Sequence, residues 1–308
     1  MHILSAKQFS AGQLEEIFDR ADEMEKALKN PAKRRALAVK YNDQQLCSLF
    51  YQPSTRTRLS FETAALKIGM GVVSTENARE FSSAAKGETI EDTIRVLNQY
   101  DFAAIAIRHH EAGAAAAAAK VSQIPIINAG DGTGEHPTQA LLDAYTIKKH
   151  FGRLDNLKVV LGGDLLHGRT TRSLSLLLSK FKNNFITFVS IAELQAGNDI
   201  KDGLRKSGTG FTETDDMAAA FKDADVVYWT RLQKEYITDP AKIPKDGFVI
   251  TKASLKSLPK TAIIMHPLPR VDEIHPDVDA DPRARYFEEA GNGLYIRMAL
   301  LDMVMESK

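Results

Sequence analysis

The chain alternates short apolar runs with longer amphipathic stretches, a pattern typical of strands that alternate with helices. Strands are predicted at residues 45–51, 71–74, 102–107, 125–128, 158–161, 185–190, 226–229 and 262–265. Helices are predicted at residues 11–29, 57–69, 89–100, 114–119, 137–151, 170–181 and 295–306, and a loop at residues 75–88. The pattern restarts after Gly152, so we expect an α/β protein with two domains, each with a central, mostly parallel sheet flanked by helices.

Length and charge narrow the class of protein. The 308 residues are enough for two domains, and 40 Lys plus Arg balance 40 Asp plus Glu. This neutral balance gives no overall attraction to nucleic acid or to an anionic membrane, so we expect neither as a partner. The single cysteine, Cys47, excludes an intrachain disulfide. Neither a signal peptide nor an apolar run of the ~20 residues that span a bilayer is evident, so we expect a cytoplasmic protein.

The segment at residues 52–58 lies between a predicted strand and a predicted helix. Amide N–H groups at a helix start attract anions, and the hydroxyls of Ser54, Thr55 and Thr57 and the guanidinium of Arg56 add donors for phosphate oxygens. The alternative is a capping segment with solvated arginines. Three hydroxyls and two arginines within residues 54–58 are more than a cap requires.

Other segments of the first half hold further candidate ligand groups. Lys86 lies in a small-residue loop and could reach an anionic ligand or be a surface lysine. Arg108 follows a strand, where open parallel sheets bind ligands, or it pairs with a carboxylate. The neighbouring pair His109–His110 suggests a metal, but no third ligand stands at a suitable spacing. His136 and Gln139 share one face of a helix start and could donate to a carbonyl or simply cap the helix.

The second half carries three segments of the same kind. Residues 162–169 follow a strand and are rich in glycine, but their spacing is not G-x-G-x-x-G, which argues against a dinucleotide site. Arg231 and Gln233 could hold a carboxylate or belong to a solvated turn. The prolines of residues 266–269 stiffen the backbone, so carbonyls there could accept from an amide NH₂, or the segment simply ends a strand.

Together these groups describe an enzyme that acts by positioning anionic substrates and stabilising charge. The sequence offers no nucleophile paired with a base, no metal cluster and no cofactor motif, so we expect neither metal nor cofactor.

These segments resemble the catalytic chains of the aspartate carbamoyltransferase family. The match runs in order, with family-like spacing, from about residue 45 to the C-terminus. The matching motifs are P-S-T-R-T-R at 53–58, K-G-E at 86–88, I-R-H at 107–109, N-A-G-D-G-x-x-x-H-P-T-Q at 128–139, G-D-L-x-x-G-R-T at 163–170, T-R-x-Q-K-E at 230–235 and H-P-L-P-R-V-D-E-I at 266–274. The resemblance implies the aspartate/ornithine carbamoyltransferase fold and carbamoyl transfer from carbamoyl phosphate to L-aspartate, an early step of de novo pyrimidine biosynthesis.

The resemblance also implies roles for individual residues. The phosphate would be held by Ser54, Thr55, Arg56 and Thr57, and the carbamoyl carbonyl would be polarised by Thr57, Arg108 and His136. The carbamoyl NH₂ would be held by Gln139 and the backbone carbonyls of Pro267 and Leu268. Aspartate would be bound by Lys86, Arg169, Arg231 and Gln233, with Ser82 and Lys86 supplied by the neighbouring subunit of a homotrimer that shares its active sites.

The implied domains are a carbamoyl phosphate-binding domain of residues 1–136 plus 293–308 and an aspartate-binding domain of residues 137–292. Whether regulatory chains also bind is left open by the sequence.

The chain departs from many members at four positions, namely Ala85, Leu166, His167 and Trp229. Lysine is frequent at the first two, tyrosine at the third and a smaller residue at the fourth. Ornithine carbamoyltransferase is the nearest rival, but that family usually has H-C-L-P where this chain has H-P-L-P at residues 266–269. A non-catalytic scaffold is a third reading, and the intact ligand positions argue against it.

Overall fold

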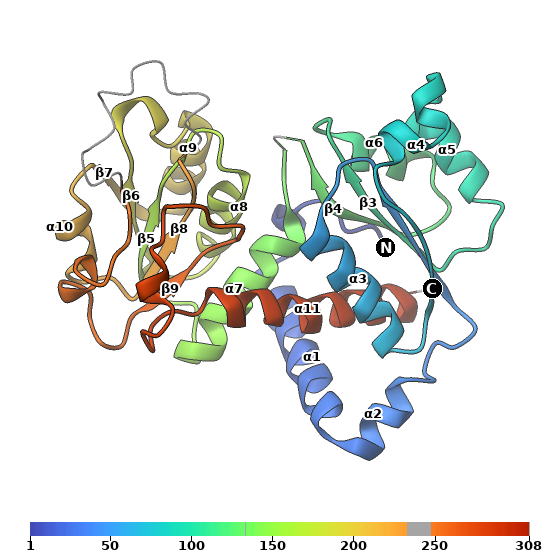
Figure 1. Cartoon of the computed structure of the whole chain (residues 1–308), viewed down its shortest axis with the longest axis horizontal. Coiled ribbons are helices and arrows are strands. Elements are labelled where there is room, and N and C mark those ends of the chain that lie inside the picture. The colour runs from blue at the N-terminus through green and yellow to red at the C-terminus, as the bar shows by residue number, and fades with distance from the viewer. Residues whose placement is uncertain (133, 233–247, 308) are drawn as a thin grey trace. The chain divides into compact units, whose positions relative to one another are not determined.

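The computed structural model describes residues 1–132, 134–232 and 248–307 (Figure 1). The chain forms two compact units, unit 1 with residues Met1–Leu141 and Gly291–Lys308 and unit 2 with residues Leu142–Ala290. It passes from one unit to the other within helix α7 (Pro137–Phe151) and again within helix α11 (Tyr286–Glu306). The sequence-based boundaries lay at residues 136/137 and 292/293.

Unit 1 has a four-stranded sheet in the order β2-β1-β3-β4, with every pairing parallel. Its strands are β1 (Gln45–Phe50), β2 (Gly71–Thr75), β3 (Ala104–His109) and β4 (Ile126–Asp131). The three strands β1, β3 and β4 are almost wholly buried, as expected for a parallel sheet covered on both faces, whereas β2 is an exposed edge strand.

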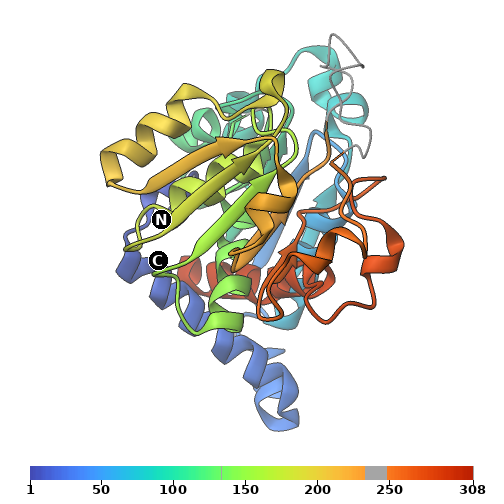
Figure 2. The ribbon, with the colours of Figure 1, turned by 90° about the vertical axis from the view of Figure 1, so that its left-hand side faces the viewer.

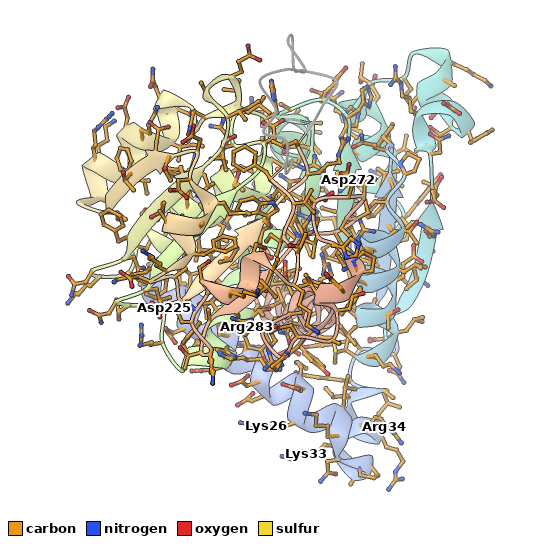
Figure 3. The ribbon with its side chains drawn as sticks, turned by 60° about the vertical axis from the view of Figure 1, so that its left-hand side comes forward. Lys26, Lys33, Arg34, Asp225, Asp272 and Arg283 are labelled. Atoms are coloured by element: carbon orange, nitrogen blue, oxygen red, sulfur yellow. The ribbon has the colours of Figure 1, made fainter. Side chains whose placement is uncertain are left out.

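Some helices of unit 1 have a hydrogen bond from their first amide groups to the side chain of the N-cap residue, and others have none. They are α1 (Ala11–Lys29), α2 (Pro31–Leu37), α3 (Thr55–Lys67), α4 (Ala78–Phe81), α5 (Ile90–Leu97) and α6 (Ala114–Val121), with 3₁₀ turns η1 (Ala6–Gln8) and η2 (Ser83–Lys86). Helix α1 starts with a capping box of Ser10 and Gln13 and buries an apolar face that includes Leu14, Ile17 and Phe18. Helix α2 buries none of its residues, and Figure 3 shows Lys26, Lys33 and Arg34 pointing outward from this end of the unit.

Unit 2 has a five-stranded parallel sheet in the order β7-β6-β5-β8-β9. The strands are β5 (Lys158–Gly162), β6 (Phe185–Val189), β7 (Gly210–Thr214), β8 (Val226–Trp229) and β9 (Ile263–Met265), and Figure 2 shows several of them side by side. The helices are α8 (Arg169–Leu178), α9 (Asn198–Ser207) and α10 (Met217–Phe221), with 3₁₀ turns η3 (Ala192–Leu194), η6 (Ser254–Lys256) and η7 (Pro276–Val278). The chain order reverses between β5 and β8, a position where open α/β sheets bind ligands.

The two parallel α/β sheets predicted from the sequence are therefore confirmed. Several details of the prediction were wrong. The loop predicted at residues 75–88 contains α4 and η2, and the strand predicted to end at Ile107 continues through Arg108 and His109. The final helix starts at Tyr286 instead of Tyr295 and includes Gly291.

Candidate active site

The N-terminus of α3 carries the segment predicted to bind an anion. Ser54 is its N-cap residue but makes no side-chain capping hydrogen bond. In contrast, Ser10, Asn30 and Thr89 each accept a hydrogen bond from the helix that they precede. The first amide groups of α3 are therefore not capped by Ser54, and such groups attract anions together with the helix dipole.

The two arginines of this segment have different surroundings. Arg58 Nη1 lies 3.2 Å from Glu62 Oε1, and Arg58 Nη2 lies 2.9 Å from Glu76 Oε2. Arg56 is exposed and has no ion-pair partner in the part of the chain that the structure describes; partial desolvation lowers its pKa. Arg58 is therefore accounted for by its own carboxylates, and Arg56 is the arginine suited to a ligand.

Thr57 and His136 lie close together although they are far apart in the chain. Thr57 Oγ1 is 3.5 Å from His136 Nε2, and both side chains are buried. Thr57 is in the first turn of α3, while His136 precedes α7. Two groups that can donate to an oxygen are thus brought together at the start of α3.

Gly130 permits Arg108 to approach the same place. A Cβ on Gly130 would lie 3.0 Å from Arg108 Nη1 and 3.2 Å from His136 Cδ2, and the glycine has a φ of 115°. Arg108 Nη1 also donates to the carbonyl of Ala129 at 3.2 Å. Arg108 and His136 therefore flank a position that only glycine occupies without crowding either of them.

The C-terminal end of β4 is fixed by polar residues of that strand. Asn128 Nδ2 donates to Asp131 Oδ1 at 3.2 Å, and Asn128 Oδ1 accepts from the Gly130 amide at 2.8 Å. Asp131 Oδ2 accepts from the Gly113 amide at 2.8 Å. Asn128 and Asp131 are thus structural members of the motif. Gln139 lies half-buried in the first turn of α7, three residues after His136.

Ser82 and Lys86 belong to the short helical segment after β2. The Ser82 hydroxyl donates to the Ala78 carbonyl at 2.5 Å and accepts from the Ala84 amide at 3.2 Å. Lys86 ends η2 with an exposed side chain. Among the described residues of this one chain, no hydrogen bond or ion pair joins either side chain to Arg56, Thr57 or His136.

Two of the four predicted aspartate ligands line a cavity of about 270 Å³ in unit 2. Arg169, the first residue of α8, and Arg231, which follows β8, both line it. The backbone segment Pro267–Leu268 lines it as well. Of the other two predicted ligands, Lys86 lies in η2 of unit 1, and Gln233 lies outside the described residues.

Two glycines at the end of β5 allow the end of β8 to pack closely against β5 beside this cavity. A Cβ on Gly163, which has a φ of 102°, would lie 2.1 Å from the carbonyl oxygen of Thr230. A Cβ on Gly162 would lie 2.0 Å from the ring of Trp229. The large side chain of Trp229 therefore fills the space that Gly162 leaves, and its Nε1 donates to the Phe248 carbonyl at 2.8 Å. This contact explains how the chain accommodates tryptophan at this position.

His167 also lines the cavity, a position that sequence reasoning noted only as a departure. Its Nδ1 lies 3.1 Å from Asp164 Oδ2, and its backbone amide donates to Asp164 Oδ1 at 2.9 Å. Asp164 is 1% exposed, so a buried carboxylate orients this half-buried imidazole. The neighbouring Leu166 is exposed.

Comparison with known proteins decides the family. The family model described as "Aspartate/ornithine carbamoyltransferase, carbamoyl-P binding domain" matches residues 1–149. The model described as "Aspartate/ornithine carbamoyltransferase, Asp/Orn binding domain" matches residues 155–304. The chain belongs to the aspartate/ornithine carbamoyltransferase family.

Curated relatives in this family match along nearly the whole chain. The chloroplastic aspartate carbamoyltransferase of Arabidopsis thaliana is 51% identical over 306 residues, covering 98% of this chain and 77% of the plant protein. The aspartate carbamoyltransferase catalytic subunit of Methanocaldococcus jannaschii is 44% identical over 307 residues, covering 99% of this chain and 98% of that subunit.

Solved structures of the family agree with the fold. The catalytic subunit of aspartate transcarbamoylase from M. jannaschii has a TM-score of 0.92 at 43% identity, covering 100% of this chain and 98% of that one. The Trypanosoma cruzi enzyme in complex with carbamoyl phosphate and aspartate has a TM-score of 0.89 at 36% identity, covering 97% of this chain and 94% of that one.

The described residues lack two further features. They hold no group of three or more His, Cys, Asp or Glu side chains placed to bind a metal ion. None of the helices that the structure describes has the length and apolar character needed to cross a membrane.

Proposed function

We propose that this protein transfers the carbamoyl group of carbamoyl phosphate to the amine of L-aspartate, giving N-carbamoyl-L-aspartate and phosphate. The observation that carries the proposal is the grouping of Thr57, His136 and Arg108 around Gly130, close to the uncapped start of α3. That arrangement offers amide and guanidinium donors for a phosphate and separate donors for a carbonyl oxygen. Relatives named aspartate carbamoyltransferase support the choice of acceptor.

The anion-binding half of the proposal rests on unit 1. The amides and hydroxyls of residues 54–57, with the Arg56 guanidinium, hold the phosphate. Arg108, His136 and Thr57 donate to the carbamoyl oxygen, whose negative charge grows as the carbon becomes tetrahedral. Donors already in place stabilise that charge without reorganisation. Gln139 accepts from the carbamoyl NH₂, together with the carbonyls of Pro267 and Leu268.

The acceptor half rests on the cavity of unit 2. Aspartate has two carboxylates, and Arg169 and Arg231 line one cavity of about 270 Å³. Each guanidinium can bind a carboxylate through two parallel hydrogen bonds. Gln233 from this unit and Lys86 complete the proposed set.

The reaction needs no covalent intermediate with the protein. The aspartate amine attacks the carbamoyl carbon and forms a C–N bond, and the carbonyl oxygen takes up negative charge. The C–O bond to phosphate then breaks, and the departing phosphate takes the proton from the amine. The protein binds, orients and stabilises charge, so a general base among its side chains is not required.

The proposed assembly is a homotrimer whose neighbouring chains supply Ser82 and Lys86 to each active site. Support comes from large apolar side chains of unit 1 that are exposed in the single chain. They are Leu59 and Leu66 on α3, Val73 on the edge strand β2 and Phe81 on α4, which is 79% exposed. Exposed apolar side chains mark an association surface where they form a contiguous patch.

Location and further subunits remain predictions. A place in the cytoplasm was predicted from the sequence, whereas the Arabidopsis relative is named chloroplastic. The archaeal relative is named a catalytic subunit, and regulatory chains are a partner to be tested by light scattering on endogenous material.

A substrate comparison with two arginine variants tests the proposal. The purified protein is given labelled carbamoyl phosphate with aspartate or with ornithine and no added metal. We expect carbamoylated aspartate only. Arg56→Ala should lower kcat by roughly 10²–10³-fold. Arg58→Ala is the matched control and should change kcat by no more than a few fold, because Arg58 pairs with Glu62 and Glu76 and is not assigned to a ligand.

Two outcomes would contradict the proposal. Product formation with ornithine alone would favour the rival activity of the family. An Arg56→Ala variant that keeps more than half of wild-type turnover would remove this arginine from the site.

A further inference from the structure

Unit 2 contains a continuous set of buried polar side chains that the proposed mechanism does not use. Its members are Asp143 on α7, Tyr228 on β8, His266 and Glu273 after β9, and Glu289 on α11, and none is more than 3% exposed. Buried ionisable groups are costly unless they are paired, so each contact within this set matters.

The imidazole of His266 has one defined tautomer. Its Nδ1 accepts from the backbone amide of Leu268 at 2.8 Å and therefore carries no proton. Its Nε2 then carries the proton and donates to Glu273 Oε1 at 2.8 Å. Glu273 Oε2 accepts from the amides of Val271 and Asp272 at 3.0 and 3.1 Å; Figure 3 labels Asp272 in this loop. Burial disfavours ionisation of Glu273, but these hydrogen bonds outweigh it and lower its pKa to about 2.

The other side of His266 is held by Glu289. The backbone amide of His266 donates to Glu289 Oε2 at 2.8 Å. The second oxygen, Glu289 Oε1, has no donor among the described residues. Burial and the facing Asp143 carboxylate raise the pKa of Glu289 well above its usual range. Two carboxylates that face each other in a buried site cannot both stay ionised at neutral pH.

The groups next to Asp143 and Glu289 are compatible with one proton held between these two carboxylates. Burial and the charges of Asp143 and Glu289 raise the pKa of Tyr228, so its hydroxyl stays protonated. Among the described residues, Tyr228 from β8 adjoins Asp143 and the Tyr228 hydroxyl also adjoins Thr170 from α8, while His266 meets Glu289 through its backbone amide. A proton on Glu289 Oε1 gives that oxygen a hydrogen bond to donate to Asp143.

We propose that Asp143 and Glu289 share one proton at neutral pH and, through the His266 amide, position the Pro267–Leu268 backbone for carbamoyl phosphate. Glu289 is a positioning residue, since it touches the His266 backbone and no proposed substrate group. This role rests on the proposed function, because Pro267 and Leu268 are assigned there to the carbamoyl NH₂. The shared proton itself does not depend on that assignment.

Infrared spectroscopy tests the proton without any substrate. A protonated carboxylic acid has a C=O stretch separate from the bands of a carboxylate. At neutral pH the spectrum of wild type minus Glu289→Gln should show this band. Glu288→Gln is the matched control, because Glu288 is an exposed neighbour on the same helix that pairs with Arg285, and its difference spectrum should show only a carboxylate. A carboxylate difference for Glu289→Gln would overturn the shared proton.

Kinetics with two substitutions test positioning. Glu289→Gln keeps an acceptor for the His266 amide and a donor toward Asp143, so KM for carbamoyl phosphate should stay within about twofold of wild type. Glu289→Leu removes the acceptor and leaves a buried amide unpaired, which should raise that KM by roughly 10- to 100-fold. Equal KM values for the two variants would overturn the positioning role.

The alkaline limb of the pH profile gives a third measurement. When the shared proton is lost, the two ionised carboxylates repel each other. In wild type the fraction of enzyme that still carries this proton, and with it the activity, should then decline about tenfold per pH unit. Glu289→Gln should keep its activity to higher pH, and coincident profiles would contradict the proposal. An inactive wild-type protein that still shows the acid band would refute the proposed function and leave the shared proton standing.

Discussion

Gly130→Ala is the sharpest test of whether Arg108 and His136 act at one point. The added Cβ would lie 3.0 Å from Arg108 Nη1 and 3.2 Å from His136 Cδ2. Both distances are shorter than the ~3.5–4.0 Å of an ordinary contact between carbon atoms. The substitution adds one methyl group and removes no polar atom, so any loss of activity reports the placement of those two side chains.

Two separate costs are expected from the structure. The φ of 115° at this position is unfavourable for alanine and should cost about 1–3 kcal/mol of stability. The crowding must move Arg108 or His136 by several tenths of an ångström, and catalytic groups tolerate only about 0.5 Å of misplacement. Since loss of one preorganised donor costs roughly 10²–10³ in rate, we expect kcat to fall by about 10²-fold.

Gly113→Ala separates these two costs. Gly113 has a φ of 85°, yet a Cβ there would meet nothing within 4 Å. It should lose a similar amount of stability in urea unfolding and keep kcat within about twofold of wild type. The reasoning is refuted if Gly130→Ala retains wild-type kcat/KM, or if Gly113→Ala loses as much activity.

Three further outcomes are expected. Arg231→Ala should raise KM for aspartate roughly 10- to 150-fold and leave that for carbamoyl phosphate nearly unchanged, because a hydrogen bond to a charged group contributes about 1.5–3 kcal/mol; equal losses for both substrates would make Arg231 structural. Inactive Lys86→Ala and Arg56→Ala chains, reassociated into mixed trimers, should recover one working site in each mixed trimer; mixed trimers verified by native mass spectrometry but lacking activity would exclude shared sites. Glu273→Gln should remove roughly 3 kcal/mol of stability at neutral pH, since the pKa of Glu273 is lowered to about 2. That contribution is complete above the unfolded pKa of about 4.5 and disappears as pH falls toward 2, so wild type and variant should converge in acid denaturation; curves that stay parallel would show that Glu273 is not ionised by these contacts.

Strands that are buried on both faces were predictable, because both faces need apolar side chains and the strand then appears in the sequence as a run of apolar residues. The segments that became β5 and β8 contain continuous apolar runs, and β1 is apolar apart from Gln45 and Ser48; the prediction located each of the three strands. Strand β7 was missed because it is a half-exposed strand at the sheet edge with the sequence GFTET. Periodicity carries little information where neither face is fully buried. Helix α9 was missed for a related reason, since its sequence NDIKDGLRKS buries only two residues, Ile200 and Leu204.

The site was predictable where several donors fall within one segment. The hydroxyls and arginines of residues 54–58 predicted an anion site. Only the structure shows that Arg58 pairs with Glu62 and Glu76, which leaves Arg56 as the arginine suited to a ligand. The carboxyl pair of Asp143 and Glu289 gave no signal in the sequence. Each lies on a helix, where an acidic residue usually faces solvent, and Glu289 directly follows the exposed Glu288. Only the fold places Asp143 and Glu289 against each other.

Trp229 gives unit 2 its own optical signal. It is the single tryptophan of the chain, so all tryptophan emission originates at one fully buried ring in unit 2. The centroid of that ring lies 5.8 Å from the ring centroid of Phe221 and 6.3 Å from that of Phe248. In the chain, Trp229 directly precedes Thr230 and Arg231, which line the cavity. Emission wavelength and lifetime therefore follow unit 2 alone, whereas the far-ultraviolet circular dichroism of the chain averages both units. Denaturation curves recorded by the two methods would separate the stability of the aspartate half from that of the whole chain without a label or an engineered residue.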